Sequence, residues 1–217
     1  MPLHLFTFNM FSENTYVLSN QNKECIIIDP GMSNREEDNI MLDFIESNGY
    51  TPTMVLNTHC HIDHILGVET LTRKYAIPFI AHKNELPTLE RGPIAAQLWN
   101  IPYRDCPTPD RFVEHGEVLR FGEFNLEILF VPGHAPGHIA IVEREHGVVF
   151  GGDVLFKGSV GRVDLPGCNK EDLIKSIQDV LYVLPDHFRV YPGHGDSTTI
   201  GEEKESNYFV SATRVSL

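Results

Sequence analysis

Cysteine is scarce in this chain: its 217 residues include only four, Cys25, Cys60, Cys106 and Cys168. No two of them form a Cys-x-x-Cys pair, so the sequence lacks the spacing of a zinc ribbon or a redox dithiol. Four scattered cysteines in a chain of this length also do not indicate the disulfide framework of a small secreted domain. We therefore expect free thiols and a reducing, cytoplasmic setting.

Long apolar runs and an excess of basic charge are missing too. No run approaches the ~20 apolar residues that cross a bilayer, and the N-terminus shows no basic segment followed by an apolar export signal. Lys and Arg number 17 against 30 Asp and Glu, which gives a net charge of −13. Because clustered cations bind phosphate backbones, we expect a small-molecule substrate and neither a nucleic-acid nor a membrane partner. The oligomeric state is not indicated.

The chain also lacks an internal linker. No proline-rich or low-complexity tract divides it, and 41% of its residues are hydrophobic, so we expect a single domain over residues 1–217. Alternating strand and helix patterns predict the α/β class. The expected strands are 3–8, 15–19, 25–29, 54–57, 79–81, 118–119, 125–131, 140–143, 148–150 and 189–191. The expected helices are 35–47, 65–75, 84–88, 170–181 and 202–208.

What the sequence does contain is a dense cluster of polar side chains at residues 58–64, Thr-His-Cys-His-Ile-Asp-His. Imidazole and carboxylate are the side chains that bind first-row divalent metals outside thiolate sites. In an extended segment His59 and His61 fall on one side of the chain and can converge on one ion. Asp63 and His64 follow where the chain turns toward a helix, so they can face a second point. The cluster thus offers ligands for two ions.

Three later segments share one pattern, in which an apolar run is followed by Pro or Gly and then by a metal-binding side chain. They end at His134, Asp153 and His194. Gly and Pro at such corners permit tight backbone angles close to a bound ion. Strand ends that deliver His or Asp to loops indicate a rigid sheet with a functional edge.

This ordered set resembles the metallo-β-lactamase superfamily. Pro-Gly-His-Ala-Pro-Gly-His at 132–138, Gly-Asp-Val-Leu-Phe at 152–156 and Pro-Gly-His-Gly at 192–195 are similar to the glyoxalase II enzymes (hydroxyacylglutathione hydrolases), especially their short bacterial members. The resemblance covers about residues 3–209 and implies a four-layer αββα sandwich. We expect no C-terminal helical glutathione-binding domain, which the longer glyoxalase II enzymes carry.

The resemblance also implies roles for the ligands. His59, His61 and His134 would bind one metal ion, Asp63, His64 and His194 would bind a second, and Asp153 would bridge both. The implied reaction is hydrolysis of a small thioester such as S-lactoylglutathione by a hydroxide that bridges the ions, with Asp63 placed to accept a proton. Zinc is the expected metal, and iron or manganese are the other candidates because His and Asp accept all three.

Residues that would recognise the substrate are expected after the bridging carboxylate. Arg162 aligns with a basic residue by which glyoxalase II enzymes hold a glutathione carboxylate, and Lys157 is a second candidate. The alternative for Arg162 is that it pairs with Asp164 and only fixes the loop. Segment 91–103, which contains Trp99, is interpreted either as a substrate wall or lid or as a buried anchor for an irregular loop.

Two further residues keep two interpretations. Cys60 either packs in the core or supplies a soft thiolate ligand. His138 either orients a ligand by hydrogen bonding or has only a structural role.

Three other functions stay open at this point. A persulfide dioxygenase-like oxidoreductase would hold a single iron ion on His59, His134 and Asp153. A metallohydrolase of lactones or other small esters would use the same seven ligands. A catalytically silent metal protein is the third alternative.

Overall fold

The computed structural model describes residues 1–211 and 214–215. The chain divides into two compact units: the first comprises Met1–Val113 with Phe121–Phe124, and the second comprises Glu114–Arg120 with Asn125–Leu217. The single domain expected over residues 1–217 remains a prediction, and its residues 212–213 and 216–217 lie outside the described range. Among the described residues, no helix combines the length and the apolar character needed to span a bilayer.

The first unit is built on a six-stranded sheet in the order β1-β2-β3-β4-β5-β6. Its strands are β1 Leu3–Phe8, β2 Glu13–Ser19, β3 Glu24–Ile28, β4 Thr51–Leu56, β5 Phe79–His82 and β6 Arg111–Val113. The first three strands are antiparallel, and β3 to β6 run parallel to one another. Since parallel strands place their carboxyl ends at one edge of the sheet, the loops after β3, β4 and β5 share that edge.

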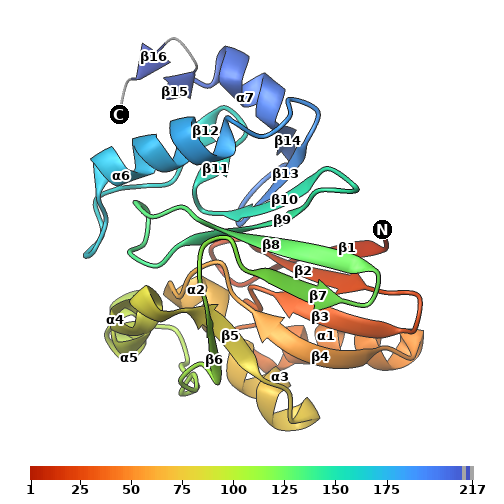
Figure 1. Cartoon of the computed structure of the whole chain (residues 1–217). Helices are drawn as coiled ribbons and strands as arrows, with labels where there is room; N and C mark the ends of the chain where they lie inside the picture. The colour runs from red at the N-terminus through yellow and green to blue at the C-terminus, as the bar shows by residue number, and fades with distance from the viewer. Residues whose placement is uncertain (212–213, 216–217) are drawn as a thin grey trace. The chain divides into compact units, whose positions relative to one another are not determined.

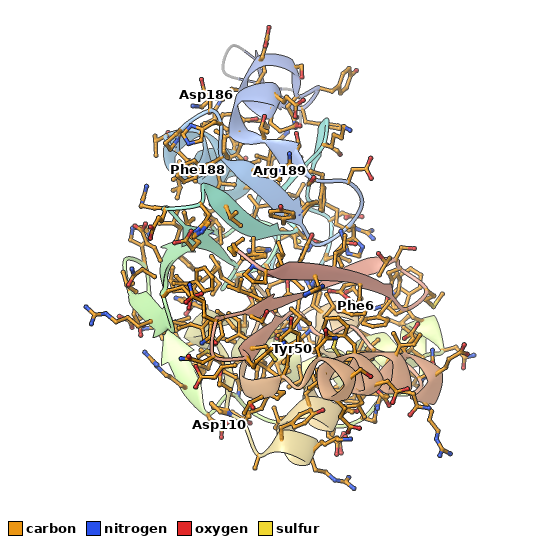
Figure 2. The ribbon with its side chains drawn as sticks, turned by 90° about the vertical axis from the view of Figure 1, so that its right-hand side faces the viewer. Phe6, Tyr50, Asp110, Asp186, Phe188 and Arg189 are labelled. Atoms are coloured by element: carbon orange, nitrogen blue, oxygen red, sulfur yellow. The ribbon has the colours of Figure 1, made fainter. Side chains whose placement is uncertain are left out.

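Helices α1 (Arg35–Asn48) and α3 (Val68–Tyr75) cover one face of this sheet (Figure 1). Asn34 caps α1 by accepting a hydrogen bond from Glu37 N, and Gly49 ends it at φ +64°, as a helix stop requires. Phe6 of β1 and Tyr50, both labelled in Figure 2, pack their rings against Phe44 of α1 at 4.9 and 5.8 Å. The amphipathic pattern that predicted helix 35–47 is therefore confirmed.

The helix expected over 65–75 is wrong at its start, because the structure has two helices there. A short α2 (Ile62–Ile65) carries Asp63 and His64, and α3 begins only at Val68. The break falls at Gly67, whose N–H donates to Pro30 O at 2.8 Å. A Cβ at Gly67 would lie 3.0 Å from the Pro30 carbonyl and 2.6 Å from the end of the Met32 side chain, so a larger residue would crowd this turn.

Segment 83–99 is helical except for the turn at Arg91, as η1 (Lys83–Glu85), α4 (Leu86–Glu90) and α5 (Gly92–Trp99). A helix was expected only over 84–88, so α5 was not predicted. Proline at the first turn of a helix has no N–H that a helical partner would need, so it starts α5 instead of preventing it.

The second unit contains a six-stranded sheet in the order β14-β13-β10-β9-β8-β7. Its strands are β7 Val118–Phe121, β8 Phe124–Phe130, β9 Ile139–Glu143, β10 Val148–Gly152, β13 Arg189–Pro192 and β14 Thr198–Thr199. Small two-stranded ribbons are formed by β11 Leu155–Phe156 with β12 Ser159–Val160, and by β15 Val210–Ser211 with β16 Arg214–Val215. The sequence analysis did not predict these ribbons, β6 or β14. Strands of two or three residues are too short to show an alternation of apolar and polar residues.

Helices α6 (Lys170–Lys175), its continuation η2 (Ser176–Leu181) and α7 (Ile200–Ser206) belong to this second unit. Leu173, Ile177 and Ile200 bury apolar side chains in one cluster with sheet residues such as Val142 and Val190. The expected helix 170–181 is confirmed, and the helix expected over 202–208 begins two residues earlier and ends at Ser206. Each unit thus pairs one sheet with helices, in agreement with the predicted α/β class.

Candidate metal centre

His59 lies just after β4, fully buried, and its ring is oriented by a chain of hydrogen bonds in the first unit. Thr58 Oγ1 donates its only proton to Asp29 Oδ2 at 2.6 Å, so it must accept from His59 Nδ1, which lies 3.1 Å away. Asp29 also accepts from Thr58 N at 2.7 Å. The proton on Nδ1 leaves the ring's lone pair on Nε2, the usual form of a metal-binding histidine.

His64 is buried on α2 beside the same carboxylate. Its Nδ1 lies 3.2 Å from Asp29 Oδ2. Its Nε2 points toward Asp63, with 3.8 Å between Nε2 and Oδ2. The ligand atoms of Asp29, His59 and His64 lie within 4.8 Å of one another. One buried carboxylate therefore fixes the tautomer of His59 through Thr58 and lies beside His64.

His61 and Asp63 stand at the N-terminal end of α2, where His61 is the residue before the first turn. The rings of His61 and His59 lie 4.8 Å apart, and the rings of His59 and His64 lie 4.1 Å apart. The Asp63 side chain keeps 14% exposure, whereas His64 has none. The structure thus gathers all four predicted ligands of the first unit at the loop between β4 and α2.

In the second unit, the Asp153 carboxylate stands between two histidines that come from different strand ends. Its Oδ2 lies 3.6 Å from His134 Nε2 and 3.4 Å from His194 Nε2. His134 follows β8, Asp153 follows β10 and His194 follows β13. The three predicted ligands of this unit are therefore brought together around a single carboxylate oxygen.

His134 is oriented by the loop that contains Arg162. Its Nδ1 donates to the Arg162 carbonyl at 2.9 Å, which again leaves the lone pair on Nε2, the nitrogen that faces Asp153. The Cys168 thiol donates to the His134 carbonyl at 2.9 Å. Backbone and side chain of His134 are both held by segment 161–168.

His138 holds the backbone of Asp153 by a hydrogen bond. It is fully buried, its Nε2 accepts a hydrogen bond from Asp153 N at 3.0 Å, and its Nδ1 faces the Ile139 carbonyl at 3.1 Å. Since a carbonyl only accepts, Nδ1 carries the proton and Nε2 is occupied by the Asp153 N–H. Of the two interpretations of His138, this geometry favours the one in which it orients a ligand residue.

Arg162 and Lys157 lie exposed in the second unit. Arg162 makes a bidentate pair with Asp164, in which Nε donates to Oδ1 at 2.7 Å and Nη2 donates to Oδ2 at 2.8 Å. The hydrogen bond from Arg162 lowers the pKa of Asp164 to about 2. Lys157 Nζ lies 3.8 Å from Asp196 Oδ2. Each basic group therefore lies beside an acid of its own chain. For Arg162 this is the pairing with Asp164 that was considered as the alternative to substrate binding.

Cys60 is buried in the core of the first unit with its thiol among apolar side chains. Burial, together with the nearby carboxylate of Glu85, raises the pKa of this thiol well above its ordinary value. Cys60 N donates to Glu85 Oε2 at 2.7 Å, so the backbone of the ligand loop is held by that buried acid. These contacts favour a packing role over a thiolate ligand.

Three supporting residues are absent from the sequence-based prediction: Asp29, Asn57 and Glu85. Asn57 Nδ2 donates to the His64 carbonyl at 2.7 Å and to the His59 carbonyl at 3.3 Å. A signal existed for Asp29, because it directly follows the buried strand β3 and stands beside a Pro-Gly corner like those at the other strand ends. Glu85 carries no such signal, since it lies in a short helix 25 residues from its partner.

Comparison with known proteins places this geometry in a family. A family model described as the metallo-beta-lactamase superfamily matches residues 9–194. A hydroxyacylglutathione hydrolase of Haemophilus influenzae, GloC, is 36% identical over 214 residues, which cover 98% of this chain and 99% of the relative.

Two solved structures share the fold. The B3 metallo-beta-lactamase BLEG-1 superposes with a TM-score of 0.88 at 32% identity and covers 95% of this chain and 98% of its own. TTHA1623 in a di-iron-bound form superposes with a TM-score of 0.85 at 36% identity, with 94% and 98% covered. The predicted metallo-β-lactamase fold and α/β class are thereby confirmed.

Proposed function

This chain belongs to the metallo-β-lactamase superfamily, and from that premise we propose that it is a dinuclear metallohydrolase that cleaves small thioesters such as S-lactoylglutathione. The observation that carries the proposal is the Asp153 carboxylate, whose Oδ2 lies within 3.6 Å of one histidine Nε2 and 3.4 Å of another. A carboxylate shared in this way suits a ligand that bridges two ions.

The donor set fits divalent metal. His59 and His134 each direct a proton on Nδ1 at a protein acceptor, which prepares Nε2 for coordination. In the proposed centre, His59, His61 and His134 would hold one ion and Asp63, His64 and His194 the other, and Asp153 would serve both. Bound ions would supply a water of lowered pKa at neutral pH and positive charge for the thioester carbonyl oxygen. Zinc is the proposed metal, and the di-iron form of TTHA1623 supports iron as the alternative occupant.

The chain's own groups then have defined tasks in hydrolysis. An oxygen–carbon bond forms between water and the thioester carbonyl carbon, and the carbon–sulfur bond breaks to release a carboxylic acid and a thiol. Asp63 is the proposed proton acceptor, because its carboxylate keeps some exposure at the start of α2 while its neighbours are buried. His138 and Asp29 act through the ligands that they orient.

The thioester class is supported by the relative from Haemophilus influenzae, which is named a hydroxyacylglutathione hydrolase and matches this chain from end to end. Arg162 and Lys157 stay proposed contacts for a substrate carboxylate. For Arg162 the substrate would replace Asp164 at the guanidinium fork, an exchange that suits the planar, bidentate geometry of arginine.

The test is S-lactoylglutathione hydrolysis by metal-loaded protein, compared with a sample treated with a chelator. We expect turnover that the chelator abolishes, and we expect Asp63→Ala or His61→Ala to lower kcat by about three orders of magnitude while the circular dichroism spectrum stays unchanged. Val183→Ser, at an exposed position of the second unit, serves as the control and should retain full activity. Turnover that persists in the chelated sample or in Asp63→Ala would overturn the proposal.

A further inference from the structure

The first unit exposes apolar side chains where a water-facing surface usually carries polar ones. Leu98 is 78% exposed, Met10 67%, Ile94 62% and Trp99 49%. These four side chains, together with Phe11, form what we call the apolar wall. Neighbouring exposed apolar groups usually mark a binding surface, whereas isolated ones need no explanation.

The two segments of the wall are joined by an aromatic contact. The rings of Phe11, in the turn between β1 and β2, and Trp99, at the end of α5, meet edge to face with centroids 5.2 Å apart. Such contacts favour one relative arrangement of the two rings. Trp99 is therefore not the buried anchor of an irregular loop, which was one interpretation of segment 91–103.

The β1–β2 turn is bonded directly to the helix that bears Asp63. Asn9 Nδ2 donates to the Asp63 carbonyl at 3.0 Å and to the Gly31 carbonyl at 2.9 Å. Asn9 Oδ1 accepts from Phe11 N at 3.0 Å, and Asn9 N donates to Glu37 Oε1 at 2.9 Å. One asparagine thus fixes Met10 and Phe11 beside the ligand helix α2.

Helix α5 approaches α2 as well. The two helices pack against each other, and they lie close together in Figure 1. Ala96 and Gly92 of α5 are buried, and a Cβ at Gly92 would lie 2.7 Å from the Tyr103 hydroxyl. The buried side of α5 is therefore held against its own unit, and Ile94, Leu98 and Trp99 remain on the surface of the helix that contacts α2.

We propose that this apolar wall binds the apolar part of the acyl group of the substrate, so that the enzyme prefers thioesters with longer alkyl chains over lactoyl and acetyl thioesters. The inference rests on the proposed thioester hydrolysis. Both segments of the wall are fixed to α2, the helix that carries Asp63 and His64, and a surface made from one turn and one eight-residue helix matches an alkyl chain better than a protein partner. An acyl chain that leaves water on this surface gains affinity with every methylene it buries.

The experiment measures kcat/KM for glutathione thioesters of acetic, butanoic, hexanoic and octanoic acid, with S-lactoylglutathione as reference. On an open surface that buries about half of each methylene, we expect kcat/KM to rise about twofold per methylene. Met10→Ser and Leu98→Ser, singly and together, should flatten that rise and leave lactoyl turnover within about twofold of the parent. Val183→Ser, a change of an equally exposed apolar side chain in the second unit, should keep the full chain-length dependence.

The outcomes separate the two proposals. Lactoyl turnover without chain-length dependence, or a dependence that survives in the double variant, would overturn the proposed role of the apolar wall. Neither result would contradict the proposed thioester hydrolysis. No turnover of any thioester by metal-loaded protein would overturn both. The remaining explanation is that the apolar wall contacts a second copy of the chain, and sedimentation equilibrium tests it. A dimer that Leu98→Ser dissociates would show such a contact and would overturn the proposal for the wall.

Discussion

At the scale of single residues, the ligands are determined by type and spacing, but their readiness to bind metal is determined by partners distant in sequence. His59 owes its tautomer to Thr58, whose hydroxyl is fixed by Asp29, 29 residues earlier in the chain. His134 owes its tautomer to a carbonyl 28 residues later. Sequence spacing predicts which side chains can bind metal, and only the fold reveals which ring nitrogen of each histidine is available for coordination.

The pair of Arg162 and Asp164 allows a direct pH test at this scale. The hydrogen bond from Arg162 lowers the pKa of Asp164 from 3.8 to about 2. A lowered carboxyl pKa means that the pairing is complete above pH 3.8 and is lost as the pH falls through about 2. Carboxyl NMR titration of Arg162→Gln should show the Asp164 pKa returning toward 3.8.

The matched control for that titration is Arg120→Gln, an exposed arginine on β7 that should leave the Asp164 pKa near 2. An Asp164 pKa that does not change in Arg162→Gln would show that the fork is not formed in solution. Such a result would also remove the competing acid that the proposed substrate carboxylate has to replace at Arg162.

At the scale of elements, glycine positions decide how closely the ligand loops pack. Gly161 is the sharpest case: a Cβ there would lie 1.9 Å from the Asp153 carbonyl and 3.1 Å from His134 Cβ. Gly158, on the ribbon between β11 and β12, has φ +68°, but a Cβ added there would meet no atom within 4 Å. The first glycine is required by contact with the ligand loop and the second only by backbone angle.

We therefore expect Gly161→Ala to displace Asp153 and to lose most bound metal on dialysis, with kcat reduced about a hundredfold. Gly158→Ala should cost only about 1 kcal/mol of stability for its left-handed backbone and should keep its metal. Metal content by mass spectrometry and thermal unfolding by circular dichroism distinguish the two changes. Equal metal retention in both variants would contradict the role given to Gly161.

Elements also show where sequence patterns stop being informative. The hydrophobic period correctly predicted β1, α1 and the helix over 170–181, because these elements are long enough to show a repeat. It began the second helix at residue 65 instead of Val68, since the break at Gly67 depends on contacts with Pro30 and Met32 rather than on local preference. It missed α5 because that helix exposes Leu98 and Ile94 and so has no ordinary amphipathic pattern.

At the scale of the whole molecule, the seven predicted ligands divide between the two compact units, four in the first and three in the second. The second set lies at three strand ends, as the repeated pattern of apolar run, corner and ligand predicted, and the first set lies in the loop after β4 and on α2. The supporting acids could not be predicted in the same way, because buried polar groups such as Glu85 satisfy partners that only the folded chain brings near. Local sequence patterns thus predict the ligands, whereas the partners that orient them come from segments distant in sequence.

The central claim, a two-metal thioesterase, is tested most directly by adding zinc to metal-free protein and following S-lactoylglutathione turnover against the number of equivalents added. The account predicts that turnover rises until two equivalents are bound per chain and then stays constant, and that Asp153→Ala abolishes the rise. Turnover that is complete at one equivalent, or that does not depend on added metal, would contradict it.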